Sequence, residues 1–146
     1  MLPKITFEIV TLKWQSLKYT EVGDACGVYQ VYGTSPLYGI DTLLYIGRSI
    51  NPKARLKDHF EFTEGALGRQ PNKSCRFAEV AGELIEIVEA TLIAMYKPSF
   101  NIAGLNNVEY KAKERAIYIQ NHGERGMLNY ENTNYYFLKP ELQGKI

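Results

Sequence analysis

The sequence has few of the residues from which disulfide scaffolds and zinc sites are built. Its 146 residues include two cysteines and two histidines. A disulfide framework needs more cysteines. A zinc site needs four ligands at close spacing, which Cys26, Cys75 and two distant histidines do not supply. We therefore expect two reduced thiols, as in proteins of reducing compartments.

Long hydrophobic segments are also missing. No run of about 20 apolar residues is present, and a membrane-spanning helix needs one. The first ten residues lack the basic, then apolar, then small-residue pattern of a signal peptide. These absences predict a cytoplasmic protein with no membrane partner. The length fits a single domain over residues 1–146, and 45% apolar residues suffice for a substantial core.

The sequence has little net charge, but the charge is unevenly distributed. The formal net charge is +1. Residues 47–76 contain seven basic and three acidic side chains, whereas residues 77–110 contain one basic and five acidic ones. A basic surface beside an acidic site is compatible with binding a phosphate backbone and a cation together. An ordinary solvated surface can show the same pattern.

Local patterns in the first half predict strands and one helix. The apolar run at residues 5–12 predicts a strand that precedes a polar loop. Residues 27–32 and 42–46 are rich in β-formers, and the short loop between them favours an antiparallel hairpin. Asn51 is a good N-cap and Pro52 suits the first helical position, so a helix is expected from Pro52 to Glu61.

The second half predicts another helix and less regular segments. Residues 74–80 are a short strand candidate, and residues 83–96 keep a helical apolar period that Pro98 ends. Residues 108–120 are expected to form a charged helix, followed by strand-like pieces. The alternative is a pair of strands at residues 116–120 and 134–138, joined by a Gly-rich turn.

Glu89 is the first candidate for a functional role. On the helix predicted at residues 83–96 it lies in line with Ile85, Leu92, Ile93 and Tyr96. A carboxylate on an apolar face is costly to bury unless it is paired, protonated or bound to a cation. Glu89 therefore either pairs with an arginine or binds a divalent cation such as Mg²⁺, which needs only one or two protein carboxylates.

Two further pairs of residues suggest phosphate chemistry. Arg55 and His59 are four residues apart and share a helix face, where they can bind a phosphate and relay a proton. Tyr29 and Tyr45 lie one on each predicted hairpin strand. Their phenols are poor bases unless nearby cations lower their pKa. By themselves, a surface Arg–His pair and two sheet tyrosines would need no functional explanation.

The order of these residues along the chain resembles the GIY-YIG nuclease family. The resemblance covers residues 27–101, about half of the chain, and departs from the usual pattern by Val28 and a slightly longer loop between the two tyrosine strands. It depends on Gly27-Val28-Tyr29, Tyr45-Ile46-Gly47, Arg55, His59, and the segment from Glu89 to Asn101.

The resemblance implies a fold and a role for each residue. The fold would be α+β, with a three-stranded antiparallel sheet flanked by helices, a nuclease core at about residues 25–103, and N- and C-terminal extensions. Residues 104–146 would form the C-terminal extension, with no assigned role. The site would contain two active-site tyrosines, a phosphate-binding arginine, a histidine assisting proton transfer, one ligand for Mg²⁺ or Mn²⁺, and a structural asparagine: Tyr29, Tyr45, Arg55, His59, Glu89 and Asn101 in that order.

The implied activity is a divalent-metal-dependent DNA endonuclease. Tyr29 would orient or deprotonate the attacking water with help from His59, while Tyr45 holds the water or the phosphate. Arg48, Lys53 and Lys57 would contact backbone phosphates, although the two lysines are equally consistent with solvated helix charges. One metal site per chain cuts one strand, so double-strand cleavage would call for a homodimer or for sequential nicks.

Several functional alternatives remain open at the level of sequence. The length and cysteine count favour a compact stand-alone enzyme, restriction-like or mobile-element-borne. Its specificity would come from the loop at residues 65–74 or from the C-terminal 45 residues. The Tyr- and Asn-rich residues 129–137 either stack on bases or pack against a partner. The rival readings are a catalytically inactive nucleic-acid-binding module on the same fold and a non-enzymatic interaction domain.

Overall fold

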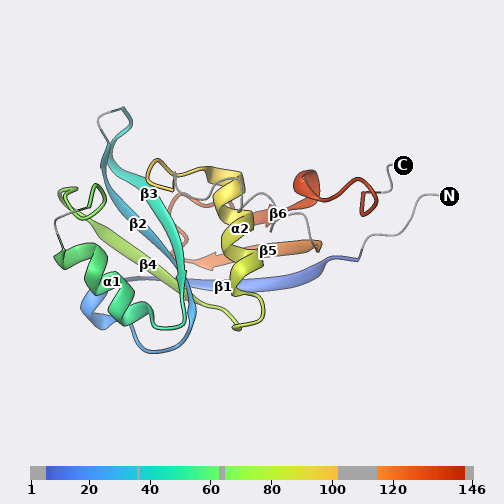
Figure 1. Ribbon diagram of the computed structural model, residues 1–146, viewed down its shortest axis with the longest axis horizontal. Coiled ribbons are helices and arrows are strands. Elements are labelled where there is room, and N and C mark those ends of the chain that lie inside the picture. The colour runs from blue at the N-terminus through green and yellow to red at the C-terminus, as the bar shows by residue number, and fades with distance from the viewer. Residues whose placement is uncertain (1–5, 36, 63–64, 102–114, 144–146) are drawn as a thin grey trace.

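The computed structural model describes residues 6–35, 37–62, 65–101 and 115–143. These residues form one six-stranded mixed sheet with two α-helices (Figure 1). The strand order is β3-β2-β4-β1-β5-β6, and every neighbouring pair is antiparallel except β1 and β5. The elements are β1 Glu8–Leu17, the 3-10 helix η1 Tyr19–Glu21, β2 Gly27–Ser35, β3 Gly39–Ser49, α1 Pro52–Glu61, β4 Ser74–Glu79, α2 Ile85–Tyr96, β5 Ile117–Gly123, β6 Glu131–Thr133 and the 3-10 helix η2 Tyr135–Phe137.

The predicted three-stranded antiparallel sheet is wrong. Strands β3, β2 and β4 are antiparallel neighbours, but β1 pairs with β4 and carries β5 and β6 into the same sheet. The reason lies in β1, where Val10, Leu12 and Trp14 are buried and the residues between them are exposed. Such a strand must bury one apolar face and must pair the backbone groups on both of its edges. The second half of the chain supplies the cover for the face and the strands that pair with the two edges.

The hairpin and both helices predicted from local signals are confirmed. Strands β2 and β3 pair antiparallel from Gly27 opposite Ser49 onward. Helix α1 begins at Pro52, where the Asn51 side chain accepts a hydrogen bond from the Ala54 amide at 3.4 Å. Helix α2 ends at Tyr96 because Lys97 adopts a left-handed conformation before Pro98.

The prediction for residues 108–120 fails where the structure can test it. Residues 102–114 lie outside the described part of the chain, but residues 117–120 belong to strand β5 and not to a helix. Ile117 and Ile119 are buried in the sheet opposite β1, which favours the strand alternative. The strand expected at residues 134–138 is also wrong, because β6 ends at Thr133 and a 3-10 helix follows.

The alternation of β2 and β3 divides their side chains between two apolar clusters. Val28 and Tyr32 pack in the cluster that includes α2, whereas Tyr29 and Val31 pack in the cluster that includes Leu56 of α1. The two helices therefore cover opposite faces of the sheet at its β3 edge. No helix in the described residues is long and apolar enough to cross a membrane.

Candidate active site

Tyr29 is the most buried member of the candidate site. It lies on β2 opposite Gly47 of β3, and its side chain has no exposed surface. A β-carbon added to Gly47 would lie 2.4 Å from Cζ of Tyr29 and 2.7 Å from Cε1 of Tyr45. Only a residue without a side chain therefore lets both phenol rings lie across β3 at this point.

Helix α1 brings Arg55 and His59 to the two tyrosines. The Tyr29 hydroxyl lies 2.9 Å from Nε2 of His59. The ring centroids are 5.0 Å apart for Tyr45 and His59, and 6.1 Å apart for Tyr29 and Tyr45. Arg55 lies one turn before His59 and close to the phenols of Tyr29 and Tyr45. Its positive charge affects the pKa of Tyr29. The structure thus brings these four predicted residues together.

The electrostatics of the cluster set the direction of the Tyr29–His59 hydrogen bond. Burial, and then the neighbouring Tyr45, raises the pKa of Tyr29, although Arg55 partly opposes the increase. Burial and the positive charge of Arg55 lower the pKa of His59 to about 4. At neutral pH the phenol therefore keeps its proton and the imidazole is uncharged. Under these conditions the Tyr29 hydroxyl donates to Nε2 of His59.

Glu89 belongs to a second group of charges on α2. Its half-buried carboxylate accepts a hydrogen bond from Nε of Arg48 at 3.0 Å, and Nη1 of Arg48 lies 3.6 Å from Glu86. Burial raises the pKa of Glu89, and Arg48 opposes that increase. The arginine pairing considered from the sequence is therefore present. The charge of Glu89 also makes the smallest of the contributions that raise the pKa of Tyr29.

The donors around Glu89 fit one kind of metal site. Among the described residues, no group of three or more His, Cys, Asp or Glu side chains could hold a metal ion. A cage made entirely of protein ligands is therefore not built from this part of the chain. A site with a single carboxylate instead suits an ion such as Mg²⁺ or Mn²⁺, which can complete its coordination with water and phosphate oxygens.

Asn101 supports the edge strand β3 and is not one of the four residues that lie together at Tyr29, Tyr45, Arg55 and His59. Its Oδ1 accepts from the amide of Ile46 at 2.9 Å, and its Nδ2 donates to the carbonyl of Ile46 at 2.8 Å. The amide of Phe100 also donates to the carbonyl of Leu44 at 2.9 Å. The segment after α2 thus pairs with the outer edge of β3, on both sides of Tyr45.

The residues predicted to contact DNA are all exposed. Arg48 follows Gly47 at the end of β3, whereas Lys53 and Lys57 lie on the solvent face of α1. Lys73 was missed from the sequence. Its Nζ donates to the carbonyl groups of Gly68 and Gln70 at 2.6 and 2.9 Å, and its charge contributes to the low pKa of His59. Contacts to backbone carbonyls leave no side-chain pattern that could have revealed it.

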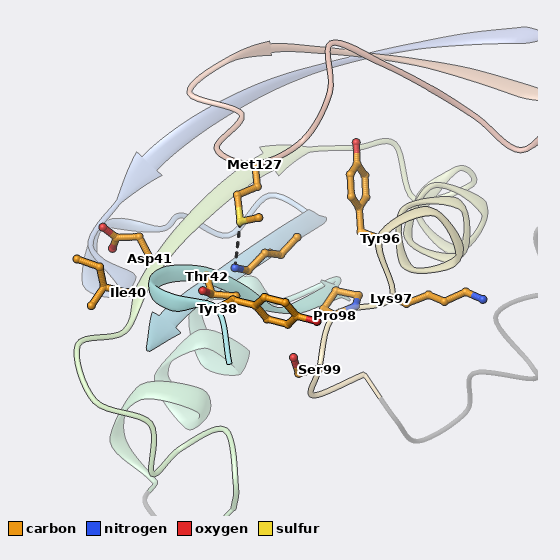
Figure 2. Close-up of a pocket in the computed structure, with 10 residues that line it drawn as sticks. Tyr38, Ile40, Asp41, Thr42, Tyr96, Lys97, Pro98, Ser99 and Met127 are labelled. Atoms are coloured by element: carbon orange, nitrogen blue, oxygen red, sulfur yellow. Dashed lines mark hydrogen bonds between the residues drawn. The ribbon is translucent and has the colours of Figure 1, made fainter. Parts of the chain in front are cut away.

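A cavity of about 370 Å³ opens directly beside this cluster. Its lining includes Tyr45, Arg55 and His59, together with the apolar side chains of Phe62, Leu67 and Phe100. A separate cavity of about 450 Å³, lined by Tyr38, Tyr96 and Met127 among others, lies at the opposite end of β3 (Figure 2). None of the predicted site residues lines that second cavity.

Similarity to known proteins gives no further guidance about the site. Comparisons with protein-family models, with curated proteins and with solved structures found no match.

Proposed function

We propose that this protein is a divalent-metal-dependent endonuclease that hydrolyses phosphodiester bonds in DNA. The observation that carries the proposal is the 2.9 Å hydrogen bond between Tyr29 and His59, with Tyr45 and Arg55 beside it. The order of these residues, with Glu89 and Asn101, resembles the GIY-YIG nucleases. That resemblance supports the reaction class, and the three-stranded fold is not part of the proposal.

The Tyr29–His59 pair can accept a proton from an attacking water without forming a free phenolate. Because the Tyr29 side chain has no exposed surface in the free protein, this step requires that DNA binding opens its hydroxyl to the attacking water. As the water oxygen forms its bond to phosphorus, Tyr29 takes the water proton and passes its own proton to Nε2 of His59. The raised pKa of Tyr29 is no obstacle, because the phenol remains protonated before and after the transfer. The bond from phosphorus to the leaving oxygen then breaks, and that oxygen receives a proton from solvent. His59, with a pKa of about 4, releases its extra proton to solvent and the pair returns to its starting state.

Arg55 and Glu89 provide the remaining functions of the proposed site. The guanidinium of Arg55 stabilises the charge that develops on the non-bridging phosphate oxygens. Glu89 would hold Mg²⁺ or Mn²⁺, and the ion supplies Lewis-acid stabilisation of the phosphate and the leaving oxygen when bound. Arg48, now paired with Glu89, would then be available to a backbone phosphate together with Lys53 and Lys57.

A plasmid-nicking assay tests the proposal. The full chain should convert supercoiled plasmid to nicked circles with Mg²⁺ or Mn²⁺, and chelation should stop the reaction. Glu89→Gln should abolish cleavage, whereas Glu83→Gln, a change in an exposed carboxylate before α2, should not. Cleavage that is absent, or that continues without a metal, would overturn the proposal. Linear product would indicate paired cuts by a homodimer or by sequential nicks.

One observation favours a second candidate, a non-catalytic nucleic-acid-binding module that uses the same surface. The ion pair between Glu89 and Arg48 already satisfies the half-buried carboxylate, so Glu89 does not require a metal for stability. This candidate predicts DNA binding that is independent of divalent ions, with no cleavage under any metal condition. The same assay, combined with a gel-shift measurement in chelator, separates the two.

A further inference from the structure

The 370 Å³ cavity beside Tyr45, Arg55 and His59 is lined by two chemically different kinds of side chain. The polar ones are Tyr45, Arg55, Asp58 and His59. The apolar ones are the rings of Phe62 and Phe100 and the side chain of Leu67. A nucleotide has the same division, with a charged phosphate joined to a flat base. The cavity volume also falls within the roughly 300–1,000 Å³ range of small-molecule sites.

Backbone hydrogen bonds hold two of the lining residues in place. The amide of Phe62 donates to the carbonyl of Asp58 at 3.1 Å and ends helix α1, so its position is defined although its side chain is 63% exposed. The carbonyl of Gly68, which also lines the cavity, accepts a hydrogen bond from Nζ of Lys73. An exposed phenylalanine on an anchored backbone contributes little to the core, but it offers a ring face to a ligand.

We infer that the apolar side chains of this cavity bind an unpaired nucleobase next to the phosphate held by Arg55. The inference rests on the proposed function and deepens it by naming the substrate class. Base–aromatic stacking supplies the affinity, and it tolerates any base because every base has a π face. The Asp58 carboxylate also lines the cavity, where it can accept a hydrogen bond from an exocyclic amino group.

The geometry of duplex DNA explains why the base must be unpaired. A base inside a protein cavity has left the helical stack, and extruding it from an intact duplex costs a few kcal/mol. Single strands, bulges and mismatched sites avoid most of that cost. The protein should therefore prefer single-stranded or locally unpaired DNA to a perfect duplex.

Binding measurements without cleavage test the inference directly. The probe is a short single-stranded oligonucleotide that contains 2-aminopurine, whose fluorescence is quenched by stacking, titrated in chelator. Phe62→Ala should weaken binding about tenfold and remove the quenching. Phe62→Tyr should restore both. Tyr38→Ala, which removes a 75% exposed ring from the other cavity (Figure 2), is the matched control and should change neither.

The outcomes distinguish this inference from the nuclease proposal. Phe62-dependent binding of single strands without any metal-dependent cleavage would retain the base site and overturn the nuclease. Metal-dependent cleavage of duplex and single-stranded DNA at equal rates would retain the nuclease and overturn the base site. Equal binding by the wild-type protein and Phe62→Ala would also overturn the base site, because removal of an exposed ring leaves the core intact.

Discussion

Tyr29 and His59 form the hydrogen-bonded pair of the proposed site. A buried phenol with a raised pKa donates to an imidazole whose pKa has been lowered to about 4, so both groups are neutral near pH 7. Transfer of one proton to this pair turns His59 into an imidazolium, and its pKa of about 4 means that it releases that proton readily near pH 7. Tyr45 lies beside the pair, with its ring centroid 5.0 Å from that of His59.

The two tyrosines should therefore differ in their effect on cleavage. Tyr29→Phe removes the hydroxyl that bonds His59 and should lower the rate of plasmid nicking by a factor of about 10²–10⁴, the usual contribution of general acid–base catalysis. Tyr45→Phe should cause a smaller loss, because Tyr45 is assigned to holding the water or the phosphate. Initial rates at saturating Mg²⁺ measure both effects. The reverse ranking would transfer the role of base to Tyr45.

The low pKa of His59 also predicts how stability depends on pH. Its pKa in the folded protein, about 4, lies below the ordinary value of 6.5. The unfolded chain therefore binds more protons between these two values. The contribution of neutral His59 to the free energy of unfolding is complete above about pH 6.5, and it is lost as the pH falls towards 4. Urea unfolding across this window should show the decrease.

A variant comparison assigns that pH dependence to His59. His59→Gln should flatten the decrease in the free energy of unfolding between pH 6.5 and 4, because the titrating imidazole is gone. His122→Gln, at the other histidine of the chain and on β5, is the matched control and should retain the slope. An unchanged slope in His59→Gln would show that other groups cause the dependence.

At the scale of elements, the outer edge of β3 depends on the segment that follows α2. Asn101 pairs with both backbone groups of Ile46, as a neighbouring strand would. Ile46 lies between Tyr45 and Gly47 in the chain, so this contact holds the strand at the point where the tyrosine rings are placed. If the proposed cleavage takes place, Asn101 would affect it through the position of β3 and not through contact with Tyr29 or His59.

Replacement of Asn101 should therefore reduce both stability and activity. Asn101→Ala leaves the buried amide and carbonyl of Ile46 without partners, at a cost of about 1–3 kcal/mol for each unsatisfied group. Chemical unfolding measures the loss, and hydrogen exchange at the Ile46 amide should accelerate. Ser99→Ala, two residues earlier and exposed, is the control. Unchanged exchange at Ile46 would show that Asn101 does not hold the edge.

At the scale of the whole molecule, the sheet joins residues from both ends of the described chain. Strand β1 lies between β4 and β5, pairing antiparallel with one and parallel with the other. Leu12 and Trp14 of β1 are buried in the cluster that also contains α2. Nε1 of Trp14 donates to Asn121 of β5 at 2.9 Å. The core around α2 is thus shared by three distant segments.

This sharing predicts that residues 25–103 will not fold alone. Without β1, the inner edge of β4 loses its partner and the apolar face of α2 loses much of its cover. The fragment should lack a cooperative urea transition by circular dichroism, whereas the full chain should show one. A fragment that unfolds cooperatively would demonstrate that β1 and β5 are dispensable additions.

The sequence alone determined the elements whose signals are local. The Asn51–Pro52 start of α1, the apolar period of α2 and the short hairpin loop are set by residues within a few positions of one another, and the structure confirms all three. The same locality placed Arg55 and His59 on one face of a helix. Only the order of residues along the chain predicts Tyr29 and Tyr45 as site residues. Two tyrosines on strands would need no functional explanation by themselves.

Only the tertiary structure decided which distant segments pair. The parallel register between β1 and β5 depends on residues more than a hundred positions apart, and no local pattern encodes such a contact. The fold likewise decides that Glu89 pairs with Arg48 and that Lys73 donates to the carbonyl of Gly68. Burial and neighbouring charges in the fold lower the pKa of His59. Sequence spacing could nominate these side chains, but their charge states and contacts are properties of the packed molecule.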